Sequence, residues 1–129
     1  MSIRTMALAT VLAAGAVATT APAQEAGDAE AGEKVFRKCM ACHTVEEGQN
    51  RVGPSLHGVV GRDVASVEDF SYSDAMLAWG EGKTWDAELL DTYLEDPRGV
   101  VEGTTMIFAG LKDEEDRRDV IAYLDATDE

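Results

Sequence analysis

The pattern of apolar and polar positions predicts helices and offers no persuasive pair of strands. Two stretches place core-forming side chains on one helical face: Leu89, Leu90, Tyr93 and Leu94, then Arg117, Val120, Ile121 and Leu124. Capping residues and prolines set the expected limits of the helices. The helices should run from Asp28 to about Met40, from Ser73 to Trp79, from a Thr84 cap to a stop at Pro97, and from Asp113 to about Ala126.

Two long segments between these helices show no sustained period. The segment from Thr44 to about Phe70 contains several turn-forming residues, namely Gly48, Gly53, Pro54, Gly58 and Gly61. Residues 98–110 are irregular as well. Loops of this length are unusual in a compact domain unless they wrap something. The pattern therefore predicts an all-α fold with long ordered loops.

The N-terminal segment differs in character from the rest. Arg4 is its only charge, Met6–Ala18 is an apolar run, and Ala21-Pro22-Ala23 matches the small-x-small pattern of a cleavage site. We therefore expect residues 1–23 to be a secretory signal peptide, cleaved after the last of these alanines, and residues 24–129 to form a single domain. The alternative is an uncleaved membrane anchor, although the apolar run is short for crossing a bilayer.

Charge narrows the classes of partner. The chain has 25 acidic and 11 basic residues, a formal net charge of −14. Such a surface repels phosphates, which argues against binding to nucleic acid. It would steer the protein toward positively charged partners. An adaptation to salt is the other interpretation, and the sequence does not separate the two.

Cys39-Met40-Ala41-Cys42-His43 is the motif that carries chemistry, because Cys-x-x-Cys-His is the attachment signature of a c-type haem. Residues three apart share one face of a helical turn. The thiols of Cys39 and Cys42 can therefore form thioethers with two vinyl groups at one edge of a porphyrin. His43 then follows beneath the ring, where its imidazole can bind the iron.

Three other interpretations of these cysteines are weaker. A thiol–disulfide oxidoreductase would need alternating strands and helices. A structural zinc usually takes four ligands, and the chain offers Cys39, Cys42, His43 and His57, two of them adjacent. A plain structural disulfide is the third.

A second iron ligand would decide between an electron carrier and a catalyst. The candidates are Met76, Met106 and His57, and Met106 lies in a glycine-flanked loop, Gly103–Gly110, that can pass close to a flat ligand. We therefore assign Met106. Ligation by a thioether closes the iron to substrates and suits electron transfer. The alternative, a five-coordinate haem protein that is peroxidase-like or binds gases, needs Met106 off the iron and a distal acid–base residue.

Residues 27–127 resemble the short class I cytochromes c of mitochondria and alphaproteobacteria. The ordered matches are chiefly Cys39–Glu46, Gly53–Gly58, Phe70–Ala75, Tyr93–Pro97, Gly103–Gly110 and Ile121–Leu124. The resemblance implies about four to five helices wrapped around one covalently bound haem c, in a monomeric periplasmic one-electron carrier without stable membrane insertion. Donors would be a quinol–cytochrome c reductase or a dehydrogenase. Acceptors would be a terminal oxidase or a photosynthetic reaction centre.

The same resemblance implies roles for residues beyond the iron ligands. Gly32 and Phe36 would pack the first helix against the last. The Pro54 carbonyl would accept the His43 ring N–H and so fix its tautomer. For His57 we prefer the plain interpretation, a loop histidine with a local hydrogen bond. The other residues would line the haem: Arg62, Tyr72 and Trp85 around a buried propionate, Tyr93 and Thr104 near the Met106 sulfur, and Phe108 over the face near the exposed edge.

The chain departs from that family around the haem edge. Lys38 and Arg98 remain from the ring of lysines found in mitochondrial members, whereas other positions hold Thr105, Asp113, Glu114 and Glu115. We therefore expect docking that is mostly apolar or that uses a basic partner. The lysines that replace the methionine ligand at high pH in some members appear here as Gly99 and Thr105. Any alkaline ligand switch should therefore use another group or begin at higher pH.

Overall fold

The computed structural model describes residues 26–127. Its helices are α1 (Ala29–Phe36), α2 (Asp74–Gly80), α3 (Ala87–Glu95), α4 (Pro97–Val100) and α5 (Glu114–Ala126). Within this described part, strand pairing is limited to an isolated antiparallel bridge between Asp63 and Thr84, so the all-α class is confirmed. Among the same residues, no helix has the length and apolar character needed to cross a membrane. The expected signal peptide, residues 1–23, lies outside the described residues.

The starts of α1, α2 and α5 confirm the expected limits. The carboxylate of Asp28 accepts hydrogen bonds from the backbone N–H groups of Glu30 and Ala31. Ser73 and Asp113 cap α2 and α5 by the same kind of contact. Each cap satisfies N–H groups that the first turn of a helix leaves unpaired, and the carboxylates also suit the positive end of the helix dipole.

The predicted N-terminal cap of α3 was wrong. The prediction that Pro97 stops this helix was right but missed the short helix that begins there. Asp86 caps α3, because its carboxylate accepts the N–H of Leu89 at 2.7 Å. The Thr84 hydroxyl instead donates to the Asp63 carboxylate at 3.0 Å. Pro97 follows the end of α3 but also opens the short helix α4, because a residue without an N–H suits the first helical position.

The first helix is shorter than expected. α1 ends at Phe36, and the chain continues toward His43 as turns. Their hydrogen bonds include Lys38 N–H to the Val35 carbonyl (3.1 Å) and Cys39 N–H to the Phe36 carbonyl (2.8 Å). These bonds join residues three apart, which is the tighter winding that commonly ends an α-helix. The cysteine motif therefore lies on tight turns and not on the α-helix itself.

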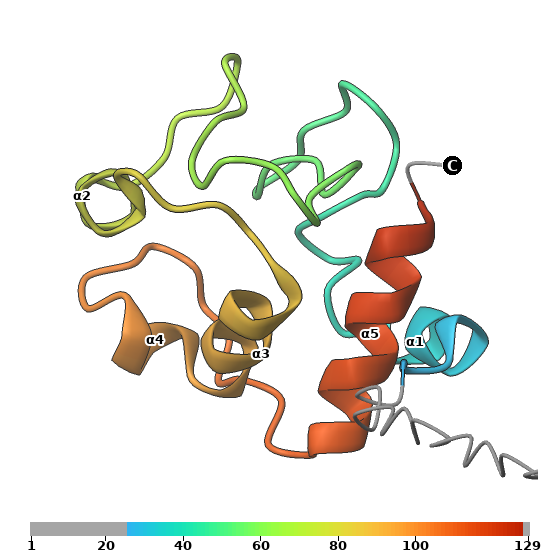
Figure 1. The fold of residues 1–129 in the computed structure, drawn as a ribbon. Helices are drawn as coiled ribbons and strands as arrows, with labels where there is room; N and C mark the ends of the chain where they lie inside the picture. The colour runs from blue at the N-terminus through green and yellow to red at the C-terminus, as the bar shows by residue number, and fades with distance from the viewer. Residues whose placement is uncertain (1–25, 128–129) are drawn as a thin grey trace, which may run out of the picture.

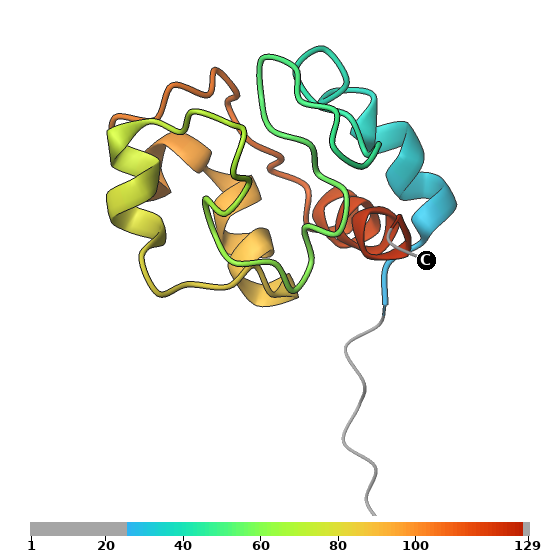
Figure 2. The ribbon, with the colours of Figure 1, turned by 90° about the horizontal axis from the view of Figure 1, so that it is seen from above.

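α1 and α5 cross closely because Gly32 has no side chain. The two helices lie side by side (Figure 1 and Figure 2), and a Cβ atom at Gly32 would fall on the backbone of Asp119 and on the Cβ of Tyr123. The Phe36 ring packs on Tyr123 with 5.3 Å between centroids. The Asp119 carboxylate accepts the backbone N–H of Asp28 at 2.7 Å. These contacts confirm that Gly32 and Phe36 pack against the last helix.

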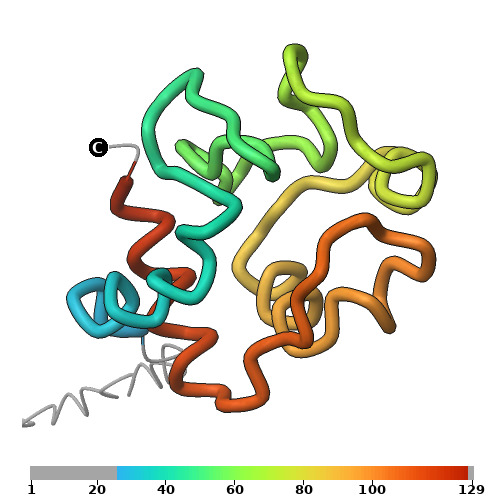
Figure 3. The backbone as a smooth tube through the Cα atoms, turned by 180° about the vertical axis from the view of Figure 1, so that it is seen from behind, coloured from blue at the N-terminus to red at the C-terminus, as the bar shows by residue number. Residues whose placement is uncertain are grey.

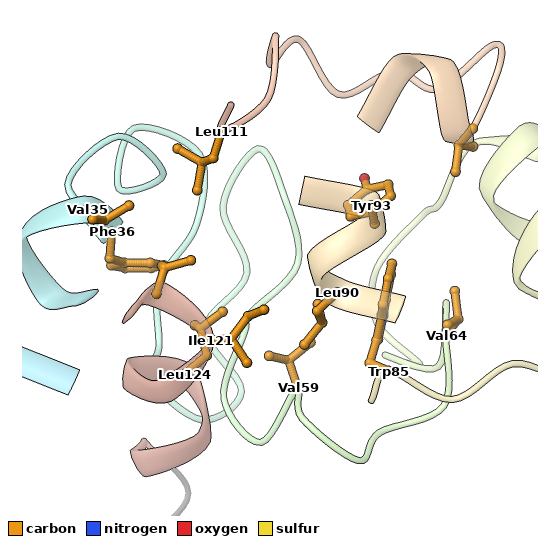
Figure 4. Packing of buried hydrophobic residues seen from close by; sticks show 12 residues of the cluster. Val35, Phe36, Val59, Val64, Trp85, Leu90, Tyr93, Leu111, Ile121 and Leu124 are labelled. Atoms are coloured by element: carbon orange, nitrogen blue, oxygen red, sulfur yellow. The ribbon is translucent and has the colours of Figure 1, made fainter. Parts of the chain in front are cut away.

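The buried core joins this helix pair to α3. Figure 4 shows it running from α1 and α5 through Val59 and Leu90 to Trp85. The stripe expected on the last helix is buried as a whole: Arg117, Val120, Ile121 and Leu124. Arg117 is the only charged residue of the four, and because it is buried it needs partners inside the protein.

Two long loops carry the residues expected to bind the iron. The loop after α1 contains His43, and the loop between α4 and α5 contains Met106. The two loops face each other across the middle of the molecule (Figure 3). The fold therefore positions both candidate ligands on irregular segments that helices support from outside.

Candidate functional site

The cysteine motif forms one turn that presents both thiols. The N–H groups of Cys42 (3.1 Å) and His43 (2.9 Å) both donate to the Cys39 carbonyl. Cys39 and Cys42 are both half-buried. Burial raises the pKa of the Cys39 thiol, an effect that Lys38 opposes and Cys42 reinforces. Two thiols and an imidazole therefore emerge from five consecutive residues, as attachment to one porphyrin edge requires.

The ring of His43 is held in one orientation. Its Nδ1 lies 2.8 Å from the Pro54 carbonyl, which makes that nitrogen the N–H donor. Burial lowers the pKa of His43, Arg62 acts in the same direction, and the Pro54 hydrogen bond opposes both. Gly53 lies against the ring, where a Cβ atom would collide with it. Nε2 therefore keeps a lone pair for a metal, and the expected contact with Pro54 is confirmed.

The sulfur of Met106 receives a directed contact. The Tyr93 hydroxyl donates to Sδ at 3.7 Å, and the Thr104 hydroxyl accepts the Met106 N–H at 3.2 Å. Burial raises the pKa of Tyr93 to about 12, so the hydroxyl keeps its proton near pH 7. The flanking Gly103 (φ 90°) and Gly110 (φ 104°) adopt the backbone conformation that favours glycine. The structure thus brings Tyr93, Thr104 and Met106 together, as expected.

Arg62 offers a buried donor without a partner in the described part of the chain. Its Nη1 donates to the carbonyls of Ser55 (3.1 Å) and His57 (2.9 Å), whereas its Nε is buried and unpaired among these residues. Burial lowers the pKa of Arg62, and an unpaired buried donor on a charged group is costly. A carboxylate on a bound group would satisfy this nitrogen. The arrangement fits the haem propionate expected here.

Tyr72 and Trp85 are the other two residues expected at the propionate. The Tyr72 hydroxyl accepts the backbone N–H of Val67 at 3.1 Å, which leaves its own O–H free to donate. It also lies close enough to Arg62 to oppose the lowering of that residue's pKa by burial. Trp85 is buried, and its backbone N–H donates to the Arg62 carbonyl at 2.9 Å. All three residues therefore border one region of the interior.

Trp79 supports the site in a way that the sequence pattern did not reveal. Its ring packs on Trp85 and on Tyr93, with 5.6 Å and 5.9 Å between centroids, and those two rings are 4.9 Å apart. The ammonium group of Lys83 lies 5.3 Å from the centroid of the Trp79 ring. The cluster backs the tyrosine whose hydroxyl reaches Met106. A single aromatic at the end of a short helix gives no signal that separates this role from ordinary packing.

The remaining expected residues lie toward the edge of the site. Phe108 is half-buried against the core, and its neighbour Ile107 is 87% exposed. His57 places Nδ1 3.2 Å from the Val45 carbonyl, which confirms a local hydrogen bond. Within residues 26–127, no three His, Cys, Asp or Glu side chains converge to hold a metal ion.

Comparison of this chain with known proteins identifies its family. The sequence model of the family described as cytochrome c matches residues 29–128. Cytochrome c2 of Blastochloris viridis is 46% identical over 108 residues, 83% of each chain, and cytochrome c2 of Rhodomicrobium vannielii is 45% identical over 119 residues, 92% of this chain and 94% of that one. The solved structure of cytochrome cH from Methylobacterium extorquens is 44% identical, with a TM-score of 0.72 over 78% of this chain and 99% of that one. The chain therefore belongs to the cytochrome c family, as an all-α class I electron-transfer protein of the alphaproteobacterial type with one covalently bound haem c.

Proposed function

We propose that this cytochrome is a periplasmic one-electron carrier in which Cys39 and Cys42 bind the haem and His43 and Met106 bind its iron. The proposal rests chiefly on the hydrogen bond from the Tyr93 hydroxyl to the Met106 sulfur. A methionine that merely fills a core needs no such donor, whereas a hydrogen bond of this kind can tune a sulfur ligand. The buried and unpaired Nε of Arg62 supports the same placement of the haem.

The chain contributes ligands, their orientation and a dry environment. When bound, the haem supplies a one-electron couple at its iron. The Pro54 carbonyl holds the His43 ring so that Nε2 keeps its direction, and Tyr93 restrains the Met106 sulfur. If His43 and Met106 both hold the iron, no open site would remain for a substrate. Because the protein holds both side chains in place, they would move little when the iron gains or loses an electron.

The partners that we propose are other redox proteins. Family analogy gives a quinol–cytochrome c reductase or a dehydrogenase as donor, and a terminal oxidase or a photosynthetic reaction centre as acceptor. Such encounters use small interfaces and dissociate quickly, which suits a monomer. Export by a signal peptide at residues 1–23 would bring the protein to the periplasm.

A five-coordinate haem protein that binds gases or reacts with peroxide is the alternative. It would need Met106 off the iron and an acid–base side chain on the same face. The Tyr93 hydroxyl donates to that sulfur, and a phenol whose pKa is raised to about 12 is poorly matched to proton transfer near pH 7. The carrier is therefore the better account of this geometry.

Optical spectra of the holoprotein test the proposed function. The oxidised protein is expected to show the weak long-wavelength band of ferric iron bonded to methionine sulfur. The reduced protein is expected to resist carbon monoxide, because both axial positions are filled. Acid-unfolded holoprotein, in which the sulfur is released, serves as the positive control for carbon monoxide binding. A missing band together with rapid binding of the gas would exclude the six-coordinate carrier.

Salt is expected to slow the reaction of this protein with cations. The net charge is −14, and the described residues contain just two ion pairs, Lys38–Asp116 and Arg117–Asp91. Attraction of this kind speeds encounters by roughly 10- to 1,000-fold and is screened by salt. In stopped flow, oxidation by a cationic cobalt(III) complex should slow as ionic strength rises, and oxidation by ferricyanide should accelerate. The opposite pair of trends would mean that basic residues beside the haem outweigh the net charge.

A further inference from the structure

The segment that carries Met106 is anchored at its ends. Val101 (1% exposed) and Leu111 (3% exposed) are buried on either side of it. The Thr104 N–H donates to the Val101 carbonyl at 3.1 Å, and the Leu111 N–H donates to a carbonyl of α3 at 2.7 Å. Between these points, residues 107–109 make no backbone hydrogen bond within the described part of the chain. The position of the sulfur therefore depends on how firmly the two ends are held.

Arg117 of α5 holds the C-terminal end of this segment. Its side chain is only 7% exposed, which is rare for a charged group unless it is paired. Nη1 donates to the carbonyls of Leu111 (2.9 Å) and Lys112 (3.1 Å), and Nε donates to Asp91 at 2.7 Å. We call Arg117 together with Leu111, Lys112 and Asp91 the Arg117 clamp.

The Arg117 clamp ties the segment to the helix that supplies the hydrogen bond to the sulfur. Asp91 precedes Tyr93 by two residues on α3, and Tyr93 donates to the Met106 sulfur. Gly110 also lies directly against the Glu95 carbonyl at the end of α3, where a Cβ atom would collide. α3 therefore carries Tyr93, which donates to the Met106 sulfur, and also contacts the C-terminal end of the segment that holds Met106.

We propose that Arg117 is a positioning residue for Met106, which keeps the sulfur seated by fixing residues 111–112 against α3. This role rests on the proposed function, in which Met106 binds the iron. Replacing a buried guanidinium that makes three charge-assisted hydrogen bonds leaves two carbonyls and Asp91 without their partner. The segment would then open locally while the packing of α1 on α5 stays intact.

Arg117→Lys and Arg118→Lys form a matched pair of holoprotein variants. Arg118 is the exposed neighbour on the same helix, and lysine keeps the charge but lacks the fork that reaches several acceptors. Imidazole displaces the methionine from ferric iron only when the segment opens. At saturating imidazole, the rate at which the sulfur–iron band disappears therefore reports opening. We expect Arg117→Lys to raise this rate about tenfold, as the loss of one hydrogen bond to a charged group implies, and Arg118→Lys to leave it unchanged.

Thermal unfolding, followed by far-ultraviolet circular dichroism, separates positioning from general stability. In Arg117→Lys the band should vanish well before the helices unfold. If band and helices are lost together and the imidazole rate is unchanged, Arg117 is a structural residue only. If the wild-type protein lacks the band, the proposed function has failed instead. Hydrogen exchange at the Leu111 amide, which donates to the Leu94 carbonyl, then still tests the clamp, because unchanged exchange in Arg117→Lys would overturn it.

Asp91→Asn provides a second variant if Arg117→Lys does not fold. It preserves the hydrogen bonds from Nη1 to Leu111 and Lys112 but removes the charge that faces Nε. We expect a smaller acceleration of the imidazole reaction in the same direction. Glu88→Gln, at an exposed position of the same helix, should have no effect. An unchanged rate in Asp91→Asn contradicts the clamp.

Discussion

Replacing Met106 by alanine is expected to abolish the weak long-wavelength band of the oxidised protein and to open the reduced iron to carbon monoxide. Cys39 and Cys42 should keep the haem attached, because thioether bonds do not depend on the sixth ligand. The reduction potential should fall, since a thioether ligand raises it. Axial ligands shift haem potentials over roughly 0.8 V, and we expect a fall on the order of 0.1 V or more. Absorption spectra and a potentiometric titration measure these changes.

Met76→Ala is the matched control for this experiment. Met76 is a half-buried methionine of α2 that packs against the core. Its replacement should preserve the band and the resistance to carbon monoxide. Survival of the band in Met106→Ala would assign the iron ligand to another residue. Loss of the band in Met76→Ala would mean that Met76 binds the iron.

Valine at Gly32 is expected to destabilise the fold more than any other single change considered. The added side chain would collide with the backbone of Asp119 and the Cβ of Tyr123, so α1 and α5 could not keep their crossing. Overpacking of this kind costs about 3 kcal/mol, and more where backbone blocks relaxation. For a domain of this size, each kcal/mol lowers the melting temperature by roughly 4–8 °C, so we expect a drop on the order of 12 °C or more. Thermal unfolding of the holoprotein measures it.

Glu33→Val controls for the lower helix propensity of valine. Glu33 is exposed on α1, next to Gly32, and valine there should cost only about 0.5 kcal/mol. Equal drops in melting temperature for Gly32→Val and Glu33→Val would mean that helix propensity, and not the close crossing, explains the effect of valine.

Local chemistry explains what could be predicted from the sequence. The spacing of Cys39, Cys42 and His43 determines which atoms can meet one porphyrin edge, and no distant residue can change that relation. The glycines around Met106 mark a backbone that passes close to another group, whichever element lies opposite. The Asp28 cap likewise depends on N–H groups within three residues of it. Each of these features is decided within one or two turns of chain.

The ends of a helix were harder to predict where two neighbouring residues could each cap it at a similar free energy. Thr84 and Asp86 are both acceptable caps, and a contact between Thr84 and Asp63, 21 residues earlier, favours the second solution. The early end of α1 reflects the tight turns that present the thiols, a requirement of the site that helix propensity does not express. Tertiary context thus overrides local preference at both places.

The roles of Arg117 and Trp79 could not be predicted because their partners lie far along the chain. Arg117 stands in an apolar stripe, where a long charged side chain could equally reach solvent. Its carboxylate partner, Asp91, is 26 residues away. Trp79 of α2 meets Tyr93 of α3 through a contact between their rings, which no periodicity encodes. The roles of Arg62, Tyr72 and Trp85 toward a propionate stay predictions, supported by one unpaired nitrogen.

The hydrogen bond between Asp28 and Asp119 joins residues 91 positions apart, which has a consequence for the order of events during biosynthesis. While the chain emerges, α1 has no surface to pack on until α5 has been made. The turn with Cys39 and Cys42 follows α1 directly, so both thiols are present in the growing chain long before α5 has been made. Contacts of such long range also slow folding as a whole. The two end helices can therefore meet only after the turn that presents both thiols has been synthesised.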